Sequence, residues 1–249
     1  GYELELKLNK KFANGIRLWG NINMTHAKNK VLLKDDAQLT PNYQKEAGYS
    51  MGQYHSYIDR GFINDIDDLI GSPAHESNDN HRLVGDYYIV DFNGDGVVDS
   101  KDSAPVGYSS NPQNTYNATI GIEYKGFSAF AQFYGVTNVT RDVTLTSFGN
   151  KLDNVYDTGT WWDMNESSPE SIIPRWGATQ SDYSNGTQFL YDGSYIRLKN
   201  VEIAYTWTKG WIKALGMNYL KVYLNGNNLW LWTRMPDDRE ANLGGGGWL

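Results

Sequence analysis

The sequence predicts an all-β protein with about six antiparallel strands, joined alternately by short turns and by long loops. Two observations lead to this fold class. Apolar and polar residues alternate with a period of two in three separate stretches, and a turn interrupts each stretch near its middle. Long polar segments rich in Gly, Asn, Asp and Ser separate these stretches from one another.

The first hairpin is predicted for residues 2–24. One parity before the turn is apolar and consists of Tyr2, Leu4, Leu6, Leu8 and Phe12. The other parity is polar and includes Glu3 and Glu5. After the turn Ala13-Asn14-Gly15 the alternation resumes between Ile16 and Met24. Alternation on both sides of an Asn-Gly pair is typical of a β-hairpin.

Two more hairpins follow much later in the chain. The second covers residues 116–134 around the turn Lys125-Gly126, and the third joins residues 194–207 to residues 217–230. The apolar parity of the strand at 194–207 changes near Asn200, which predicts a β-bulge there. The connection over residues 208–216 is long enough to hold one helical turn.

The connections between hairpins are very uneven. Long polar segments at about 27–113 and 140–193 link the hairpins, and an open tail begins at about 233. Short turns at one end of the strands and long loops at the other are the organisation of an outer-membrane β-barrel, and strands of about ten residues suit a tilted membrane strand. We therefore predict a transmembrane antiparallel β-barrel fragment of about six strands with long extracellular loops.

Side chains near the short turns and along the strands support this fold class. Aromatic residues, which gather at both interfaces of such barrels, stand beside all three short turns: Phe12, Tyr124, Phe127, Trp207, Trp211 and Tyr219. The alternation also predicts which residues face lipid: Leu4, Leu6, Leu8, Ile16, Leu18, Ile120, Ile122, Val222 and Leu224. The residues expected to face the lumen are Glu3, Glu5, Asn21, Asn117 and Glu123.

Composition limits the possible functions. The chain has 249 residues, a net charge of −7 and no cysteine. The negative charge argues against a nucleic-acid surface, and the lack of cysteine excludes disulfides, thiolate catalysis and Cys-ligated zinc. The mean hydropathy is −0.58, which is compatible with a barrel because only alternate strand residues face lipid. A signal peptide is not found, and we interpret the chain as a piece of a longer protein.

Residues 91–102, Asp-Phe-Asn-Gly-Asp-Gly-Val-Val-Asp-Ser-Lys-Asp, have the spacing of a calcium loop. Side-chain oxygens stand at loop positions one, three, five, nine and twelve, and Gly96 allows the sharp turn. The predicted ligands of a structural Ca²⁺ are Asp91, Asn93, Asp95, the carbonyl of Val97, Asp99 and Asp102. An EF-hand usually has a Glu where Asp102 stands. The alternative is a polar, Gly-rich surface turn.

Other residues carry weaker signals. The four histidines (His26, His55, His75 and His81) lack the spacing of metal ligands, and the acidic pairs at 67–68, 166/170 and 237–238 are best explained as solvated loop charge. The loop aromatics could stack on sugar faces or pack within the loops, and packing is the default. These aromatics are Tyr43, Tyr49, Tyr54, Tyr57, Phe62, Trp161, Trp162 and Trp176.

Five stretches resemble SusC/RagA-type TonB-dependent transporters. The run GDYYIVDFNGDGVVDSKDSAPVGYSSNPQNTYNATIGIEYKGFSAFAQFYG (85–135) is similar to the calcium-like loop and following hairpin of this family. KEAGYSMGQYHSYIDRGFIND (45–65) resembles the extracellular segment before that loop. YDGSYIRLKNVEIAYTW (191–207) and LKVYLNGNNLWLWT (220–233) resemble two of the last strands, and DDREAN (237–242) the acidic stretch after them. The resemblance covers nearly the whole chain.

The resemblance implies an importer of oligosaccharides or peptides in the outer membrane of Bacteroidetes. Such an importer is powered through TonB and capped by a SusD-like surface lipoprotein. Residues 1–249 would then be the C-terminal part of the barrel, without the plug domain, the TonB-contact segment and the final strand, since six strands are far fewer than the about 22 of such transporters. Residues 91–102 would lie in the first long extracellular loop. Neither catalysis nor an organic cofactor is expected.

Two other classes of protein are weighed against the transporter. One is a secreted β-sandwich that binds glycans and carries a dockerin-like calcium loop, and the other is a β-rich glycosidase that uses loop carboxylates. A sandwich should have connections of more even length. A glycosidase needs two carboxyl groups held about 5–10 Å apart across a cleft.

Overall fold

The computed structural model describes residues 1–77, 79–142, 174–175 and 186–235. The chain forms two compact units. The first, called the sheet unit, contains residues 1–28, 112–139 and 193–249. The second, called the loop unit, contains residues 29–111 and 140–192. The loop unit therefore coincides almost residue for residue with the two long connections predicted from the sequence.

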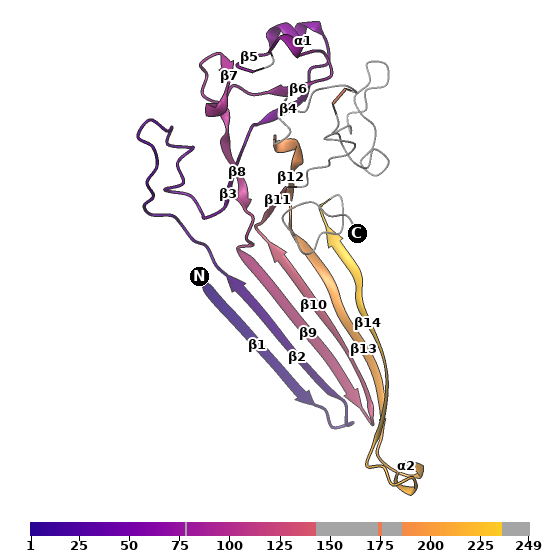
Figure 1. The fold of residues 1–249 in the computed structure, drawn as a ribbon. Helices are drawn as coiled ribbons and strands as arrows, with labels where there is room; N and C mark the ends of the chain where they lie inside the picture. The colour runs from indigo at the N-terminus through magenta and orange to yellow at the C-terminus, as the bar shows by residue number, and fades with distance from the viewer. Residues whose placement is uncertain (78, 143–173, 176–185, 236–249) are drawn as a thin grey trace. The chain divides into compact units, whose positions relative to one another are not determined.

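The sheet unit is a six-stranded antiparallel sheet in the order β1-β2-β9-β10-β13-β14, so each strand pairs with its nearest sequence neighbours in the unit. Its strands are β1 (Tyr2–Lys11), β2 (Arg17–His26), β9 (Asn114–Tyr124), β10 (Phe127–Thr137), β13 (Tyr195–Trp207) and β14 (Leu220–Thr233). Figure 1 shows the three hairpin turns gathered at one end of this sheet. The three predicted hairpins are confirmed.

The turn between β9 and β10 shows why the sequence places glycine there. Lys125 and Gly126 both have positive φ, 46° and 90°, as a two-residue type I′ hairpin turn requires. A Cβ atom at Gly126 would lie 2.6 Å from the backbone oxygen of Thr206. Only glycine both adopts this conformation easily and lets the next hairpin approach so closely.

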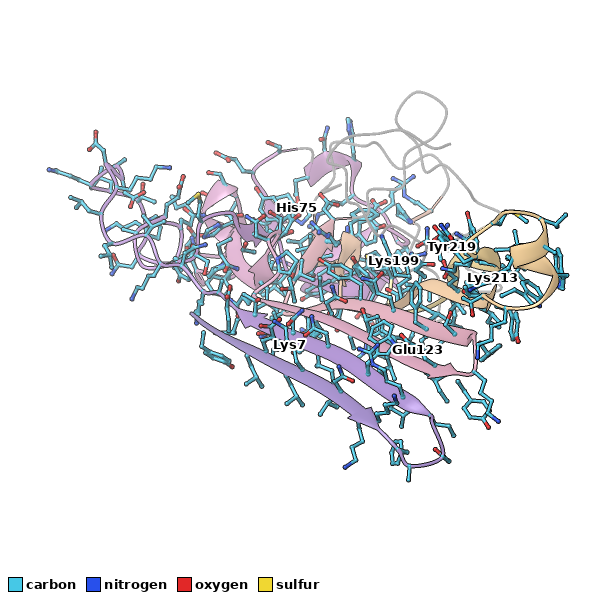
Figure 2. All side chains as sticks on the ribbon, turned by 90° about the horizontal axis from the view of Figure 1, so that it is seen from below. Lys7, His75, Glu123, Lys199, Lys213 and Tyr219 are labelled. Carbon is cyan, nitrogen blue, oxygen red and sulfur yellow. The ribbon has the colours of Figure 1, made fainter. Side chains whose placement is uncertain are left out.

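The β-bulge predicted near Asn200 lies at Lys199, which is labelled in Figure 2. On β10, Gln132 pairs with Asn200 and Phe133 with Leu198, so Lys199 has no opposite residue. The pairing with β14 is irregular at the same place. One extra residue reverses which parity faces which side, and this accounts for the change in the apolar pattern.

The connection between β13 and β14 contains the helical turn α2 (Trp211–Ala214), as the length of this segment predicts. The last strand begins at Leu220 and ends at Thr233, three residues later at each end than the sequence pattern predicts. The delay has a local cause. Residues 215–217 complete the end of the helical turn through backbone hydrogen bonds and are not free to extend the strand.

The loop unit contains short paired strands in place of simple loops. The pairs are β3 (Gln53–Ser56) with β8 (Ala104–Ser109), β4 (Asp59–Phe62) with β6 (Tyr87–Ile89), β5 (Ala74–His75) with β7 (Val97–Val98), and β11 (Thr140–Asp142) with β12 (Leu190–Asp192). The unit also holds the helix α1 (Ile66–Gly71) and the 3₁₀ turns η1 (Asp79–His81), η2 (Ser100–Asp102) and η3 (Thr187–Phe189). Tyr87, Ile89, Val98 and Phe189 form its buried cluster.

The helices of the described residues are all short. The longest, α1, has six residues, and none is long and apolar enough to cross a membrane.

Candidate functional site

One face of the six-stranded sheet is apolar from edge to edge. Residues directly opposite one another on antiparallel strands project from the same face, so the pairing register assigns each side chain to a face. One row across all six strands consists of Leu6, Ile22, Ala118, Phe133, Leu198 and Trp230. Two rows further along the same face stand Leu18, Ile122, Ala129, Ile203 and Leu224, and Lys10 at the β1 edge is the charged exception in this row.

This apolar face is exposed. Large side chains on three of its strands, Leu4, Ile120 and Leu224, are 63%, 54% and 76% accessible to solvent. In a soluble protein such positions form the buried core, and a contiguous exposed apolar patch seldom exceeds about 300–600 Å². A face of six strands about 4.8 Å apart and several rows high exceeds that range. The face therefore requires an apolar environment outside this chain.

The opposite face is polar. A row across the six strands consists of Lys7, Asn21, Thr119, Gln132, Asn200 and Asn227. Lys7 and Glu123, both labelled in Figure 2, belong to this face. Arg17 lies 3.2 Å from Glu123 across the β2–β9 pair, and Lys221 lies 2.7 Å from Glu202 across the β13–β14 pair. The predicted division into two faces is thus confirmed for the strand residues, while Ile16 lies in the turn before β2.

The polar face also carries an aromatic pair that the sequence pattern did not single out. Trp19 and Phe130 face each other across β9, with ring centroids 6.3 Å apart. Between them, Gly121 leaves room for the indole, because a Cβ there would lie 2.3 Å from a ring atom of Trp19. The signal in the sequence was the glycine within an otherwise regular strand.

Residues 91–102 form a tight loop that is closed by its own carboxylates. Asp91 accepts hydrogen bonds from the backbone N–H groups of Gly94 and Gly96, each at 2.7 Å. Asn93 accepts from the N–H of Asp95 and also donates to the Asp95 carboxylate at 3.0 Å. Gly96 has φ of 94°, which permits the sharp turn expected at this position.

The second half of this loop is closed by Asp102. Its carboxylate is fully buried and accepts from the N–H groups of Phe92, Asn93 and Asp99. Asp99 caps η2 and lies 3.0 Å from the ammonium of Lys101. The ion pair and hydrogen bonds with Lys101 lower the pKa of Asp99. Val97 lies in the two-residue strand β7.

The predicted calcium ligands therefore share one small loop, and their oxygens are of the type that Ca²⁺ prefers. In this structure they accept mainly from backbone N–H groups. No group of three or more His, Asp or Glu side chains is arranged to hold a metal ion in the described part of the chain. The donor set fits calcium in chemistry and spacing, and binding would require these side chains to turn toward a common point.

A second segment of the loop unit holds the same loop, a contact that no local pattern in the sequence predicts. The Tyr43 hydroxyl donates to the carbonyl of Lys101 at 2.6 Å, and the Gln44 amide donates to the carbonyl of Ser100 at 2.7 Å. The rings of Tyr43 and Phe92 pack edge to face, with their centroids 4.9 Å apart. Residues about 58 positions apart are thereby joined, and only the tertiary structure could reveal this.

The loop aromatics within the described residues pack against one another. Tyr57 and Phe62 contact the buried cluster, Phe62 stacks on Tyr87 at 5.4 Å, and Tyr49 meets His55 edge to face at 5.7 Å. Burial raises the pKa of both Tyr54 and Tyr87. Packing, the default expectation, is confirmed for these residues. Trp161, Trp162 and Trp176 lie outside the described residues, as do the acidic residues 166, 170, 237 and 238.

The charged groups of the loop unit have structural partners. The guanidinium of Arg175 lies 2.9 Å from the buried carboxylate of Asp86. His75 is buried beside Arg82, and both burial and that positive charge lower its pKa to about 4. His26 and His55 make hydrogen bonds to Asn114 and to the carbonyl of Tyr43. These contacts give His26, His55, His75 and Asp86 a role in packing.

The fold places the chain in a class of all-β proteins. Their antiparallel sheet has one apolar exposed face and one polar face, with short turns at one end of the strands and long connections at the other. No family model matches the chain. TonB-dependent receptor P26 of Formosa agariphila is 29% identical over an alignment of 188 positions, which covers 67% of this chain and 17% of that protein. TonB-dependent receptor P3 of the same organism is 26% identical over 161 residues, 64% of this chain and 16% of that protein.

Solved structures show the same fold. The structure of the RagAB peptide transporter matches 94% of this chain and 25% of that chain, with a TM-score of 0.67 and 16% identity. The RagAB peptide importer in its open-open state matches with a TM-score of 0.65 and 16% identity, over the same shares of the two chains. The resemblance to TonB-dependent receptors read from the sequence is confirmed, and the chain spans about a sixth of the length of the curated relatives.

Proposed function

We propose that this chain is part of the barrel wall of a TonB-dependent importer of the SusC type in the outer membrane. The observation that carries the proposal is the exposed apolar face that crosses all six strands opposite a polar face. A barrel wall has this arrangement, because alternate residues face lipid and a hydrated lumen. In this proposal residues 1–249 are the C-terminal part of the barrel, and the plug domain and the last strand belong to polypeptide outside this sequence.

The sheet edges support the same proposal. β1 and β14 each pair on one side only within the described residues, so one row of backbone N–H and C=O groups on each is left for another strand. A bilayer does not tolerate open sheet edges, since unpaired backbone groups have no water to bind there. Neighbouring strands of the same barrel would satisfy both edges.

The substrate and partner follow from the family resemblance and from the loop unit. We assign oligosaccharides or peptides as substrates, TonB as the energy-coupling partner of the whole protein, and a SusD-like surface lipoprotein as the lid. The described part of the loop unit has its own buried cluster, which suits a pore mouth and a seat for such a lid. The related solved structures are those of a peptide transporter.

The proposal is tested on the full-length protein in liposomes. Because this chain has no cysteine, a single Cys replaces Ile120 or its neighbour Thr119 and carries a spin label. We expect the label at 120 to collide with oxygen dissolved in lipid and the label at 119 with a water-soluble relaxation agent. Equal exposure of both labels to water would refute the barrel wall and would favour a secreted β-sandwich.

We further propose that residues 91–102 bind a structural Ca²⁺ through Asp91, Asn93, Asp95, the carbonyl of Val97, Asp99 and Asp102. The spacing and oxygen chemistry support it, as does Gly96, whose positive φ allows the chain to curl around an ion. Extracellular sites of this type work at dissociation constants as weak as about 10⁻⁴–10⁻³ M. Calcium would add order to a loop that Tyr43 and Gln44 already hold.

Calcium titration of the full-length protein tests this site, with hydrogen exchange of residues 91–102 as the readout. We expect slower exchange with Ca²⁺ than with Mg²⁺, and loss of the effect in Asp91→Ala/Asp95→Ala. Asp67→Ala/Asp68→Ala is the matched control, because it removes the same charge from the exposed helix α1. An unchanged exchange rate at millimolar Ca²⁺ would leave the surface-turn explanation.

A further inference from the structure

The turn end of the sheet is strongly basic, although the chain as a whole has a net charge of −7. The segments 10–18, 122–128 and 203–222, which contain the three turns, carry a single acidic residue, Glu123. Their basic residues are Lys10, Lys11, Arg17, Lys125, Lys209, Lys213 and Lys221. Positive charge is therefore concentrated at the turn end of the sheet, and the overall composition does not explain this concentration.

Five of these seven basic residues have no acidic partner among the described residues. Arg17 pairs with Glu123, and Lys221 pairs with Glu202. Ion pairs are not found for the exposed side chains of Lys10, Lys11, Lys125, Lys209 and Lys213 within the part of the chain that the structure describes. Their positive charges are available for an anion outside this chain.

The β13–β14 connection presents two of these lysines on a preorganised structure. At the end of α2 the N–H of Met217 donates to the carbonyl of Ile212 at 3.2 Å, and the N–H of Gly216 donates to the carbonyl of Lys213 at 2.9 Å. With Gly216 at φ of 76°, this is a Schellman ending, and it buries Ile212 completely. The other two turns are short hairpin turns without any helix.

The rest of this connection is apolar and exposed. Trp211, Leu215 and Tyr219 are 55%, 64% and 65% accessible, although Ile212 beside them is buried. Lys213 of α2 and Tyr219 are labelled in Figure 2. These apolar residues follow directly on the apolar face of the sheet. At the turn end of that face Trp207 pairs with Leu220, and Tyr205 pairs with Val222. Exposed aromatics next to lysines suit a membrane interface, where rings lie at headgroup depth and ammonium groups reach phosphates.

We infer that the turn end of the sheet, and above all the β13–β14 connection, binds the phosphate groups of anionic phospholipids in the leaflet that faces the short turns. Lys209 and Lys213 contact the headgroups, and Trp211 and Tyr219 enter the interface beside them. The inference rests on the proposed membrane location and adds a lipid preference to it. Its support is the charge complementarity and the continuity with the apolar face.

The test uses the full-length protein in nanodiscs that contain equal amounts of phosphatidylglycerol and phosphatidylcholine. Native mass spectrometry after partial delipidation counts the retained molecules of each lipid. We expect the unchanged protein to retain phosphatidylglycerol in preference. Lys213→Gln should lower this preference by about fivefold, and Lys209→Gln/Lys213→Gln should lower it further. Lys209→Arg/Lys213→Arg should keep it.

The matched control is Lys28→Gln/Lys30→Gln, which removes the same charge next to the other end of β2. It should leave the lipid preference unchanged. Equal retention of both lipids by the unchanged protein, or an equal loss in the control, would overturn the inference. So would a variant that lowers import in cells while retaining phosphatidylglycerol normally, because the lysines would then contact a protein. The spin label at residue 120 separates these results from a failure of the membrane proposal itself.

Discussion

The two units of this chain are organised in opposite ways. The loop unit hides its apolar residues, with Ile63, Ile89 and Val98 at most 1% accessible. The sheet unit exposes most of the large apolar side chains of its strands, and backbone hydrogen bonds between neighbouring strands hold the six strands together. Burial within the chain therefore stabilises the loop unit, while the sheet unit depends on its backbone hydrogen bonds and, in the proposed barrel wall, on the surrounding lipid. The same amino acids have opposite roles in the two units.

The largest effect should come from truncating the same residue type in the two units. Ile89→Ala opens a cavity in the buried cluster and should lower the stability of the loop unit by about 2–5 kcal/mol. Ile120→Ala, on the exposed face, leaves no cavity within this chain and should cost far less. Denaturation of the full-length protein in detergent micelles, followed by hydrogen exchange in each unit, measures both. Equal losses would contradict the contrast.

A charge placed on the apolar face should have the next largest effect. Ile120→Arg should cost about 2–4 kcal/mol if the residue lies near the bilayer midplane, because the guanidinium loses its water. Thr119→Arg adds the same group on the polar face and should be nearly neutral. Folding yield into liposomes, read from heat-modifiable migration in gels, compares the two variants. A Thr119 variant that folds worse than the Ile120 variant would reverse the assigned faces.

Acid should weaken the loop unit more than the sheet. The folded-state pKa of His75 is about 4, below the ordinary 6.5, because the ring is buried beside Arg82, while Asp79 acts in the other direction. The unfolded state therefore binds more protons than the folded state between pH 6.5 and 4. The stabilisation that depends on a neutral His75 is fully present above pH 6.5 and is lost as the pH falls toward 4. The loss should reach about 2–3 kcal/mol.

Hydrogen exchange of β5 and β7 as a function of pH measures this loss. His75→Gln should flatten the profile between pH 6.5 and 4, since the group that takes up the proton is then gone. A profile that keeps its slope in this variant would assign the acid sensitivity to the carboxylates of the unit.

The smallest effect concerns glycines in the two units. Gly126→Ala places a Cβ 2.6 Å from the oxygen of Thr206 at a positive φ, and should cost about 1–3 kcal/mol of sheet stability. Gly94→Ala has the same backbone strain at φ of 75° but meets no atom within 4 Å. It should cost about 1 kcal/mol. Unfolding midpoints of the two variants test the difference, which would vanish if the neighbouring hairpin could shift away from residue 126.

Much of the sheet could be predicted from the sequence. Period-two alternation over residues 2–24 and 116–134 predicted four strands, which the structure places at 2–11, 17–26, 114–124 and 127–137, and the Asn-Gly and Lys-Gly pairs marked two of their turns. Even the bulge at Lys199 was visible, because one extra residue shifts the apolar parity. These features are local, so a few neighbouring residues contain the information.

The sequence by itself determined the six long strands of the sheet, two of their turns, the two faces and the oxygen spacing of residues 91–102, since each depends on residues close together in the chain. The tertiary structure alone decided the strand order, the aromatic pair of Trp19 and Phe130, the clamp of Tyr43 and Gln44 on residues 100–101, and the contact of Arg175 with Asp86. Such contacts join residues tens of positions apart. They depend on how the chain closes its long loops, and no local pattern encodes that choice.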